Sequence, residues 1–391
     1  MPRTLVDNIG LLVTNDLSHD GTPLGKVHDA ALLIENGVIS WVGQSSSSPL
    51  GDVAKVVDAH GRCVIPGFVD SHSHLIFAGD RSEEFRARMA GEPYSAGGIG
   101  YTVELTRLAS NGALLQNARK LIAEANASGT TTMECKSGYG LTVDDEARSL
   151  VVAKQVTDET TYLGAHVIPK EFKDSVEDYI DLVCGPMLEA ALPHAKWIDV
   201  FCDKGAFTTE QTRRILKAGI ARGLRPRLHA NQLELGDGIM LGVELGAASV
   251  DHVSYFDDED IHALASSNTV ATLLPSAEFS TRGVYPDARR LHEAGVDVAL
   301  ASDCNPGSSY TTNIPFVIAL GVRDLHFSPE QALWSATKGG ALALQRADIG
   351  HLGVGAKADF SILSTPSYIH LAYRPGVPLI DEVWRNGTRI K

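Results

Sequence analysis

Two histidines one residue apart, His72 and His74, follow an apolar run at 64–69 that is typical of a β-strand. Side chains two positions apart on a strand project to the same side, so both imidazoles point in one direction. Neutral imidazole nitrogens are the commonest ligands of zinc and similar divalent ions. The pair therefore predicts one half of a metal site.

Three further residues with metal-binding side chains follow other apolar runs. His229 ends the run 224–228, Asp303 follows the run 296–302, and His252 closes a shorter one. One histidine at a strand end is more often a hydrogen-bonded structural residue. Several buried imidazoles and a carboxylate are costly to bury without a shared partner, and a cation is the obvious partner. Together these residues favour a metal site over a structural role.

This set of residues points to hydrolysis. We predict that one divalent ion, zinc or ferrous iron, is bound by His72, His74, His229 and Asp303. Such an ion can lower the pKa of a bound water from about 16 to about 7. Asp303 could accept the proton of that water, and His252 could orient it or stabilise negative charge on the substrate. His252 as a fifth ligand remains an alternative.

Strands and helices alternate along the middle of the chain. Eight strands are expected at 64–72, 130–136, 161–166, 197–202, 224–229, 249–252, 270–274 and 296–303. Eight alternations predict a (β/α)8 barrel, in which active sites lie at the carboxyl ends of the strands. A doubly wound open sheet is the rival architecture, but its glycine-rich phosphate fingerprint does not follow the first strand.

Both ends of the chain have the character of strands and turns. Asn36-Gly37 lies between two apolar runs, which is a strong hairpin signal, and the last residues repeat this style. We therefore expect 1–63 and 354–391 to build one small β domain. The barrel would then occupy 64–353.

Composition excludes several classes of protein. With 44% hydrophobic and 21% charged residues the chain is an ordinary globular protein, and no apolar run approaches the roughly 20 residues of a membrane span. A net charge of -14 without a basic stripe argues against nucleic acid as a partner. Five dispersed cysteines and the absence of a signal-peptide pattern predict reduced thiols and a cytoplasmic location.

Longer motifs resemble a known family. The segment 66–74, Pro-Gly-Phe-Val-Asp-Ser-His-Ser-His, resembles the metal-dependent amidohydrolase superfamily when it is combined with His229, His252 and Asp303. Further segments resemble the imidazolonepropionase family within it: 74–81, 134–141, 163–169, 199–202 and 302–308. The resemblance spans nearly the whole chain. Its most specific parts are Lys-Ser-Gly-Tyr-Gly at 136–140 and Asp-Cys-Asn-Pro-Gly at 303–307.

The resemblance implies a distorted TIM-like barrel with a small β-sandwich built from both termini. It also implies hydrolysis of the cyclic amide 4-imidazolone-5-propanoate to N-formimidoyl-L-glutamate, a step of histidine degradation. Because this small molecule carries a carboxylate, a bidentate arginine would suit it. The implied substrate contacts are Arg81, Tyr139, His166, Gln232, Asn305, Gly307 and Ser308. A single metal ion and an unmodified Lys136 are expected, and a homodimer is the commonest assembly for such an enzyme.

The sequence departs from the family at a few positions. Ala96-Gly97-Gly98-Ile99 replaces a triple glycine, and the connection from Tyr139 to His166 is short. Gln232 stands where some relatives carry Glu, which argues against the deaminases that need a glutamate there. Two alternatives are another hydrolase for a small carboxylated ring and a barrel that has lost catalysis, although the intact metal ligands disfavour the second.

Overall fold

The computed structural model describes residues 3–49, 51, 53–91 and 98–391. The family departure at 96–97 therefore lies outside the described residues. Contacts within the chain define two compact units. One comprises Met1–Ser71, Ala123–Thr132 and Asn313–Lys391, and the other comprises His72–Ile122 and Met133–Thr312.

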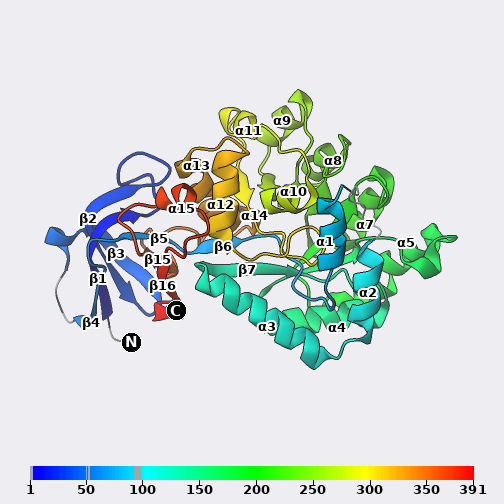
Figure 1. Cartoon of the computed structure of the whole chain (residues 1–391), viewed down its shortest axis with the longest axis horizontal. Helices are drawn as coiled ribbons and strands as arrows, with labels where there is room; N and C mark the ends of the chain where they lie inside the picture. The colour runs from blue at the N-terminus through cyan, green and yellow to red at the C-terminus, as the bar shows by residue number, and fades with distance from the viewer. Residues whose placement is uncertain (1–2, 50, 52, 92–97) are drawn as a thin grey trace. The chain divides into compact units, whose positions relative to one another are not determined.

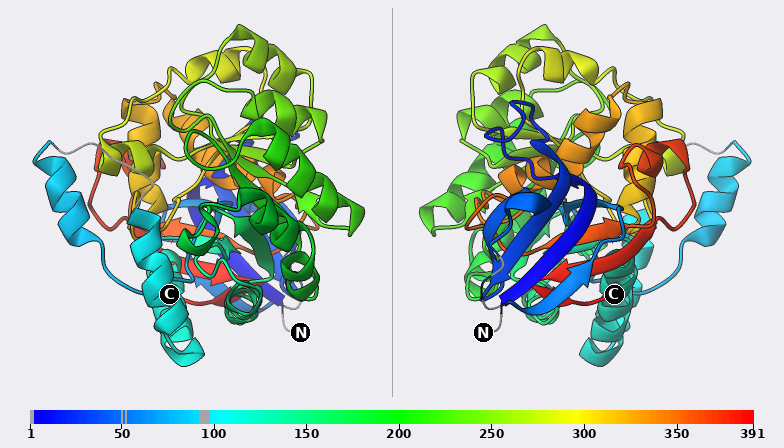
Figure 2. Two further views of the ribbon diagram at one scale, coloured as in Figure 1. Left: turned by 90° about the vertical axis from the view of Figure 1, so that its right-hand side faces the viewer. Right: turned by 90° about the vertical axis from the view of Figure 1, so that its left-hand side faces the viewer.

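The first unit contains one mixed sheet of eight strands, drawn from both ends of the chain (Figures 1 and 2). Its path is β17-β16-β15-β5-β1-β2-β3, and β4 pairs with β1. The strands are β1 (Arg3–Val13), β2 (Lys26–Glu35), β3 (Val38–Gln44), β4 (Val53–Asp58), β5 (Cys63–Pro66), β15 (Phe360–Leu363), β16 (Ile380–Arg385) and β17 (Thr388–Arg389). The right-hand view of Figure 2 shows the blue N-terminal strands beside the red C-terminal ones. The predicted β domain built from both termini is confirmed.

Local sequence explains this sheet. Asn36 and Gly37 join β2 to β3, and both adopt positive φ angles, 52° and 80°, as the tight hairpin turn requires. The core draws on both ends of the chain, since Leu12 belongs to the same buried cluster as Phe360 and Trp384. The rings of Phe360 and Trp384 stack with centroids 5.5 Å apart. Residues more than 340 positions apart thus share one core.

The second sheet is the predicted barrel. Its strands run in the order β14-β13-β12-β11-β9-β8-β7-β6, with β10 paired to β9, and the pairs from β7 to β14 are parallel. They are β6 (Phe68–Asp70), β7 (Thr130–Lys136), β8 (Glu159–Ala165), β9 (Trp197–Cys202), β10 (Arg225–Pro226), β11 (Leu228–Ala230), β12 (Ser249–His252), β13 (Val270–Leu273) and β14 (Val298–Leu300). The fold class predicted from the alternation is confirmed.

Two predicted strands are corrected. The run 224–229 is interrupted at Arg227 and forms β10 and β11. The run 64–72 is not a single strand, because the chain changes hydrogen-bond partners at Gly67. The Gly67 amide donates to the Asp359 carbonyl, whereas the Phe68 amide donates to the Gly129 carbonyl. A Cβ on Gly67 would lie 2.3 Å from the Thr131 side chain, so glycine permits this close crossing. β5 therefore joins the small sheet, and β6 joins the barrel.

Helices follow most barrel strands, and Figure 1 shows α7, α8 and α9 on the outside of the second unit. The helices before residue 200 are α1 (Ser82–Met89), α2 (Ile99–Leu108), α3 (Asn111–Ala127), α4 (Val143–Ala153), α5 (Val176–Cys184) and α6 (Pro186–Ala191). The later ones are α7 (Thr209–Ala221), α8 (Gly238–Glu244), α9 (Asp258–Ala265), α10 (Pro275–Thr281), α11 (Arg289–Glu293), α12 (Ile314–Arg323), α13 (Pro329–Trp334), α14 (Gly340–Ala343) and α15 (His370–Tyr373). None of the helices in the described part of the chain combines the length and apolar character that a bilayer crossing needs.

Candidate functional site

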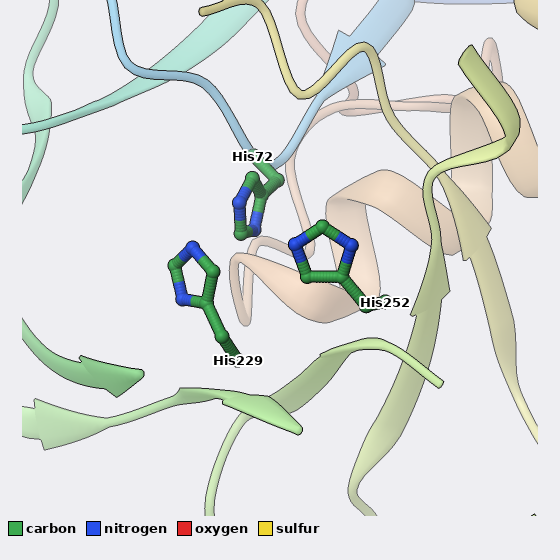
Figure 3. Close-up of side chains that lie close together, drawn as sticks. All are labelled: His72, His229 and His252. Atoms are coloured by element: carbon green, nitrogen blue, oxygen red, sulfur yellow. The ribbon is translucent and has the colours of Figure 1, made fainter. Parts of the chain in front are cut away.

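The predicted metal-binding side chains converge at the carboxyl ends of the barrel strands. Potential ligand atoms form two groups, and within each group they lie within 4.8 Å of one another. The first group is His72, His229 and His252, and the second is His72, His74 and Asp303. Figure 3 shows the imidazoles of His72, His229 and His252 turned toward one another. The structure thus gathers five side chains that lie up to 231 positions apart in the sequence.

The inner atoms of this group surround one position. His74 Nε2 lies 3.3 Å from His72 Nε2 and 3.3 Å from His229 Nε2. The Asp303 Oδ1 atom lies 3.6 Å from His72 Nε2 and 3.5 Å from His74 Nε2. All four side chains are buried. Their Nε2 atoms and one carboxylate oxygen therefore face a common centre.

The protonation preferences of these groups fit a bound cation. Burial, followed by repulsion from Lys136, lowers the pKa of His72 well below its usual range, and burial does the same for His74. These imidazoles are neutral and keep lone pairs for a metal. Burial also raises the pKa of Asp303, because a carboxylate among neutral imidazoles lacks a compensating positive charge. A divalent ion would supply that charge.

Two aspartates contact the outer nitrogens of the histidines. His72 Nδ1 lies 2.7 Å from Asp251 Oδ2, and His229 Nδ1 lies 3.1 Å from Asp199 Oδ1. Burial raises the pKa of Asp199, but His229 and Lys136 outweigh it and hold that pKa well below its usual range. A carboxylate only accepts hydrogen bonds, so each Nδ1 carries the proton and each Nε2 presents a lone pair to the centre.

The sequence analysis did not identify these two aspartates as functional. A signal was present, because Asp199 is an acidic residue within the otherwise apolar strand β9 and Asp251 directly precedes His252 in β12. Acidic residues are rarely fully buried unless they are paired. The sequence does not show which distant imidazole pairs with which carboxylate.

Strained backbone occurs at the same strand ends. His252, Val253 and Asp303 have φ angles of 78°, 50° and 51°. Non-glycine residues rarely adopt such values, and a β-branched residue such as Val253 does so least readily. Strain of this kind persists only where the surrounding structure imposes it, and it clusters at functional sites. Here it turns the His252 and Asp303 side chains toward the centre.

A pocket opens directly above this group. It holds about 350 Å³ of empty space, part of it open to solvent. Its walls include six of the seven predicted substrate contacts: Arg81, Tyr139, His166, Gln232, Asn305 and Ser308. The seventh, Gly307, lies between Asn305 and Ser308. Four residues of the metal group also line the pocket: His74, His229, His252 and Asp303. The two predicted sets of residues therefore meet in one place.

The Lys-Ser-Gly-Tyr-Gly segment forms one wall. His166 Nδ1 donates to the Gly138 carbonyl at 2.9 Å, while burial lowers the pKa of His166 to about 3, so its ring is neutral. The buried Glu146 carboxylate accepts hydrogen bonds from the backbone amides of Gly138 and Gly140 at 3.0 and 2.8 Å. This carboxylate fixes the loop that carries Tyr139, whose side chain is 98% buried.

Arg81 also lines the pocket. Its Nε and Nη2 atoms each donate to one oxygen of Glu84, both at 2.7 Å. A Cβ on Gly307 would lie 2.2 Å from Arg81 Nη1, so glycine leaves room for the guanidinium. Arg88 Nη2 donates to the Gly307 carbonyl at 2.6 Å. Two buried arginines therefore bring positive charge to the pocket near Gly307.

The loop after Asp303 is held by the Asn305 amide. Asn305 Nδ2 donates to the Asp303 carbonyl and to Ser308 Oγ at 2.6 and 2.8 Å, and its Oδ1 accepts from the amides of Gly307 and Ser308. Ser308 Oγ also donates to Asp303 Oδ2 at 3.1 Å. Asn305 thus shapes the loop with its side chain, and Ser308 links the loop to the Asp303 carboxylate.

The fold is that of the amidohydrolase family. Residues 206–391 match the model of the amidohydrolase family, and residues 55–100 match a second amidohydrolase family model. Zinc-complexed atrazine chlorohydrolase from Arthrobacter aurescens is similar in structure, with a TM-score of 0.72 at 17% identity, covering 99% of this chain and 95% of that one. At this identity the likeness shows the fold alone.

Closer relatives narrow the family. An imidazolonepropionase of Mycolicibacterium smegmatis is 61% identical over 99% of this chain and 97% of its own length. Another, from Streptomyces griseus, is 59% identical over the full length of both chains. The chain belongs to the imidazolonepropionase family and is a hydrolase of carbon–nitrogen bonds.

One more buried acid lies near the site and was not anticipated. Glu278, on α10, accepts a hydrogen bond from Ser254 Oγ at 2.6 Å, and burial raises its pKa to about 7 from an ordinary value of 4.5. Its negative charge would also oppose ionisation of Asp303. Glu278 is therefore largely protonated in the folded chain at slightly acidic pH.

We expect the Glu278→Gln variant to lack the loss of folding stability that wild type shows as pH rises. The folded state binds the Glu278 proton more tightly than the unfolded state. Protonation of Glu278 therefore contributes fully to the free energy of unfolding below pH 4.5, and this contribution is lost as pH rises through 7. Denaturant unfolding between pH 5 and 8 should show wild type losing on the order of 3 kcal/mol relative to the variant. The exposed Glu83→Gln is the control, and parallel pH profiles for wild type and Glu278→Gln would contradict this prediction.

Proposed function

We propose that this pocket binds 4-imidazolone-5-propanoate and hydrolyses its cyclic amide to N-formimidoyl-L-glutamate. Membership of the imidazolonepropionase family supports the reaction. One observation carries the assignment to this pocket: a cluster of metal-binding side chains and the Arg81 guanidinium line the same cavity. The first suits activation of water, and the second suits a carboxylated substrate.

We assign His72, His74, His229 and Asp303 as the residues that would hold the metal. When bound, a divalent ion supplies Lewis acidity and lowers the pKa of a coordinated water. Lys136 and Arg227 contact three buried carboxylates, those of Glu134, Asp199 and Asp251, and His72 links Asp251 to a fourth, that of Asp303. Four carboxylates thus stand against two cations. The excess of two negative charges equals the charge of one divalent ion, which favours a single zinc or ferrous ion.

The remaining steps fall to groups of the chain itself. The Asp303 carboxylate accepts the proton of the attacking water and returns it to the ring nitrogen that leaves. Ser308 Oγ, at 3.1 Å, keeps this carboxylate oriented. His252 borders both the pocket and the metal group, so it can donate a hydrogen bond to the oxygen on which negative charge develops.

The pocket walls orient the substrate. The cationic end formed by Arg81 and by the loop at Asn305, Gly307 and Ser308 would hold the propionate. Tyr139 would help to hold the propionate, and His166 and Gln232 would contact the imidazolone ring.

The assembly and location of the chain are part of the same proposal. We expect a homodimer, the commonest assembly for enzymes of this kind, which light scattering of the purified protein would check. Five free cysteines, four of them buried, suit the reducing cytoplasm.

Removal of the metal should abolish hydrolysis. Elemental analysis of purified protein should find about one zinc or iron per chain, and chelation followed by one equivalent of metal should remove and restore turnover.

Asp303→Asn should lower kcat by about 10²- to 10⁴-fold, since the amide cannot accept the proton. Robust turnover by metal-free protein, or preference for hydantoins or aminopyrimidines over the imidazolone, would refute the proposal.

Arg81→Met should weaken substrate binding more than it slows chemistry. Loss of a charge-assisted contact to the propionate should raise KM by roughly tenfold or more, with a smaller change in kcat. The matched control is Arg86→Met, because Arg86 lies on α1, which begins directly after Arg81, pairs with Glu83 and is exposed. Equal KM values for the two variants would show that Arg81 does not bind the carboxylate.

A further inference from the structure

The function proposed above leaves one buried lysine without a role. Lys136 is the last residue of β7, and its side chain is fully buried. Its Nζ lies 2.9 Å from Asp199 Oδ2, 3.1 Å from Glu134 Oε1 and 3.9 Å from Asp251 Oδ2. Glu134 accepts a hydrogen bond from this ammonium, and Asp199 and Asp251 are ion-pair contacts.

Two of these carboxylates are the ones that contact the metal-binding histidines. Asp199 presents Oδ2 to Lys136 and Oδ1 to His229 Nδ1. Asp251 Oδ2 is shared between Lys136 and His72 Nδ1. The Lys136 ammonium therefore contacts both carboxylates that pair with His229 and His72, two histidines from different parts of the barrel.

The third carboxylate links the same lysine to the His-x-His segment. Glu134 Oε2 accepts a hydrogen bond from the Ser73 amide at 3.0 Å, and Ser73 separates His72 from His74. Thr161 Oγ1 also donates to Glu134 Oε1. Lys136 is thus connected through Asp251 and Asp199 to His72 and His229, and through Glu134 to the backbone between His72 and His74.

The surroundings also define the chemical state of Lys136. In a carbamylated lysine, a negatively charged group would replace the ammonium and face three carboxylates at close range. Arg227 is the other buried cation here, and its Nη2 lies 3.4 Å from Asp251 Oδ2. Like charges in a buried site repel strongly, so the contacts favour an unmodified ammonium.

We propose that Lys136 is a positioning residue for the metal centre. Its ammonium holds Asp199 and Asp251 so that His229 and His72 keep their protons on Nδ1 and direct Nε2 toward the ion. This inference rests on the proposed metal site, but not on the identity of the substrate. Without the ammonium, Asp199 loses its close contact with Lys136 and Asp251 keeps only Arg227, so the orientation of both imidazoles is less firmly fixed.

The direction in which metal affinity changes distinguishes a positioning role from a purely electrostatic or a purely structural role. A cation near a metal site repels the ion, so a purely electrostatic role predicts tighter metal binding once Lys136 is neutralised. A purely structural role predicts lower stability with unchanged metal affinity. A positioning role predicts weaker metal binding, because partners behind metal-bound histidines typically contribute about 10- to 100-fold in affinity.

The test compares Lys136→Met and Lys136→Arg with wild type. We would measure the zinc dissociation constant by competition with a chromogenic chelator, and the melting temperature of the same samples. Lys136→Met should weaken zinc binding by roughly 10- to 100-fold, and Lys136→Arg should recover part of that loss. The control is Lys196→Met, since Lys196 pairs with Glu159 at the opposite end of β8 from His166 and should leave zinc affinity unchanged.

A second variant covers the case in which Lys136→Met does not fold. Lys136→Met combined with Glu134→Gln removes one positive and one negative charge, and Glu134→Gln alone is its reference. The double variant should bind zinc more weakly than Glu134→Gln. Equal or tighter zinc binding in either lysine-to-methionine variant would overturn the proposal. Wild-type protein that binds zinc but does not hydrolyse the imidazolone would instead refute only the proposed function.

Discussion

The structure depends on one constraint: the charged and polar groups buried in the barrel must pair with one another. Buried carboxylates and cations cost free energy unless each finds an opposite charge and a hydrogen-bond partner. Lys136 and Arg227 provide this for three carboxylates, while Asp303 faces only neutral imidazoles on the metal side. The proposed divalent ion would offset the resulting imbalance of charge.

Strand ends and loops have different roles in this site. Strand ends hold the metal-binding side chains, because a barrel brings the carboxyl ends of distant strands to one edge. Loops hold the groups that would recognise substrate: Tyr139 lies on a loop fixed by Glu146, and Ser308 lies on a loop fixed by Asn305. In both loops one polar side chain caps several backbone amides. Rigid loops of this kind can place polar groups with the accuracy that recognition requires.

Much of this arrangement could be predicted from the sequence, and the reasons are local. Alternating apolar runs indicated the barrel strands, Asn36-Gly37 indicated a hairpin, and His72 and His74 stood two apart at a strand end. The prediction failed at 64–72, where periodicity shows an apolar run but not which sheet each half joins. Asp199, Asp251 and Glu278 were also passed over, because an acidic residue in an apolar segment does not reveal its partner.

The sequence by itself determined the fold class, the family and the types of residue available for chemistry, since these follow from periodicity and from motifs that are contiguous in the chain. Only the tertiary structure decided which carboxylate faces which imidazole, which nitrogen of His72 and His229 points to the centre, and where Lys136 directs its charge. The physical reason is that these are contacts across strands, set by sheet register and side-chain packing, and no local pattern encodes them.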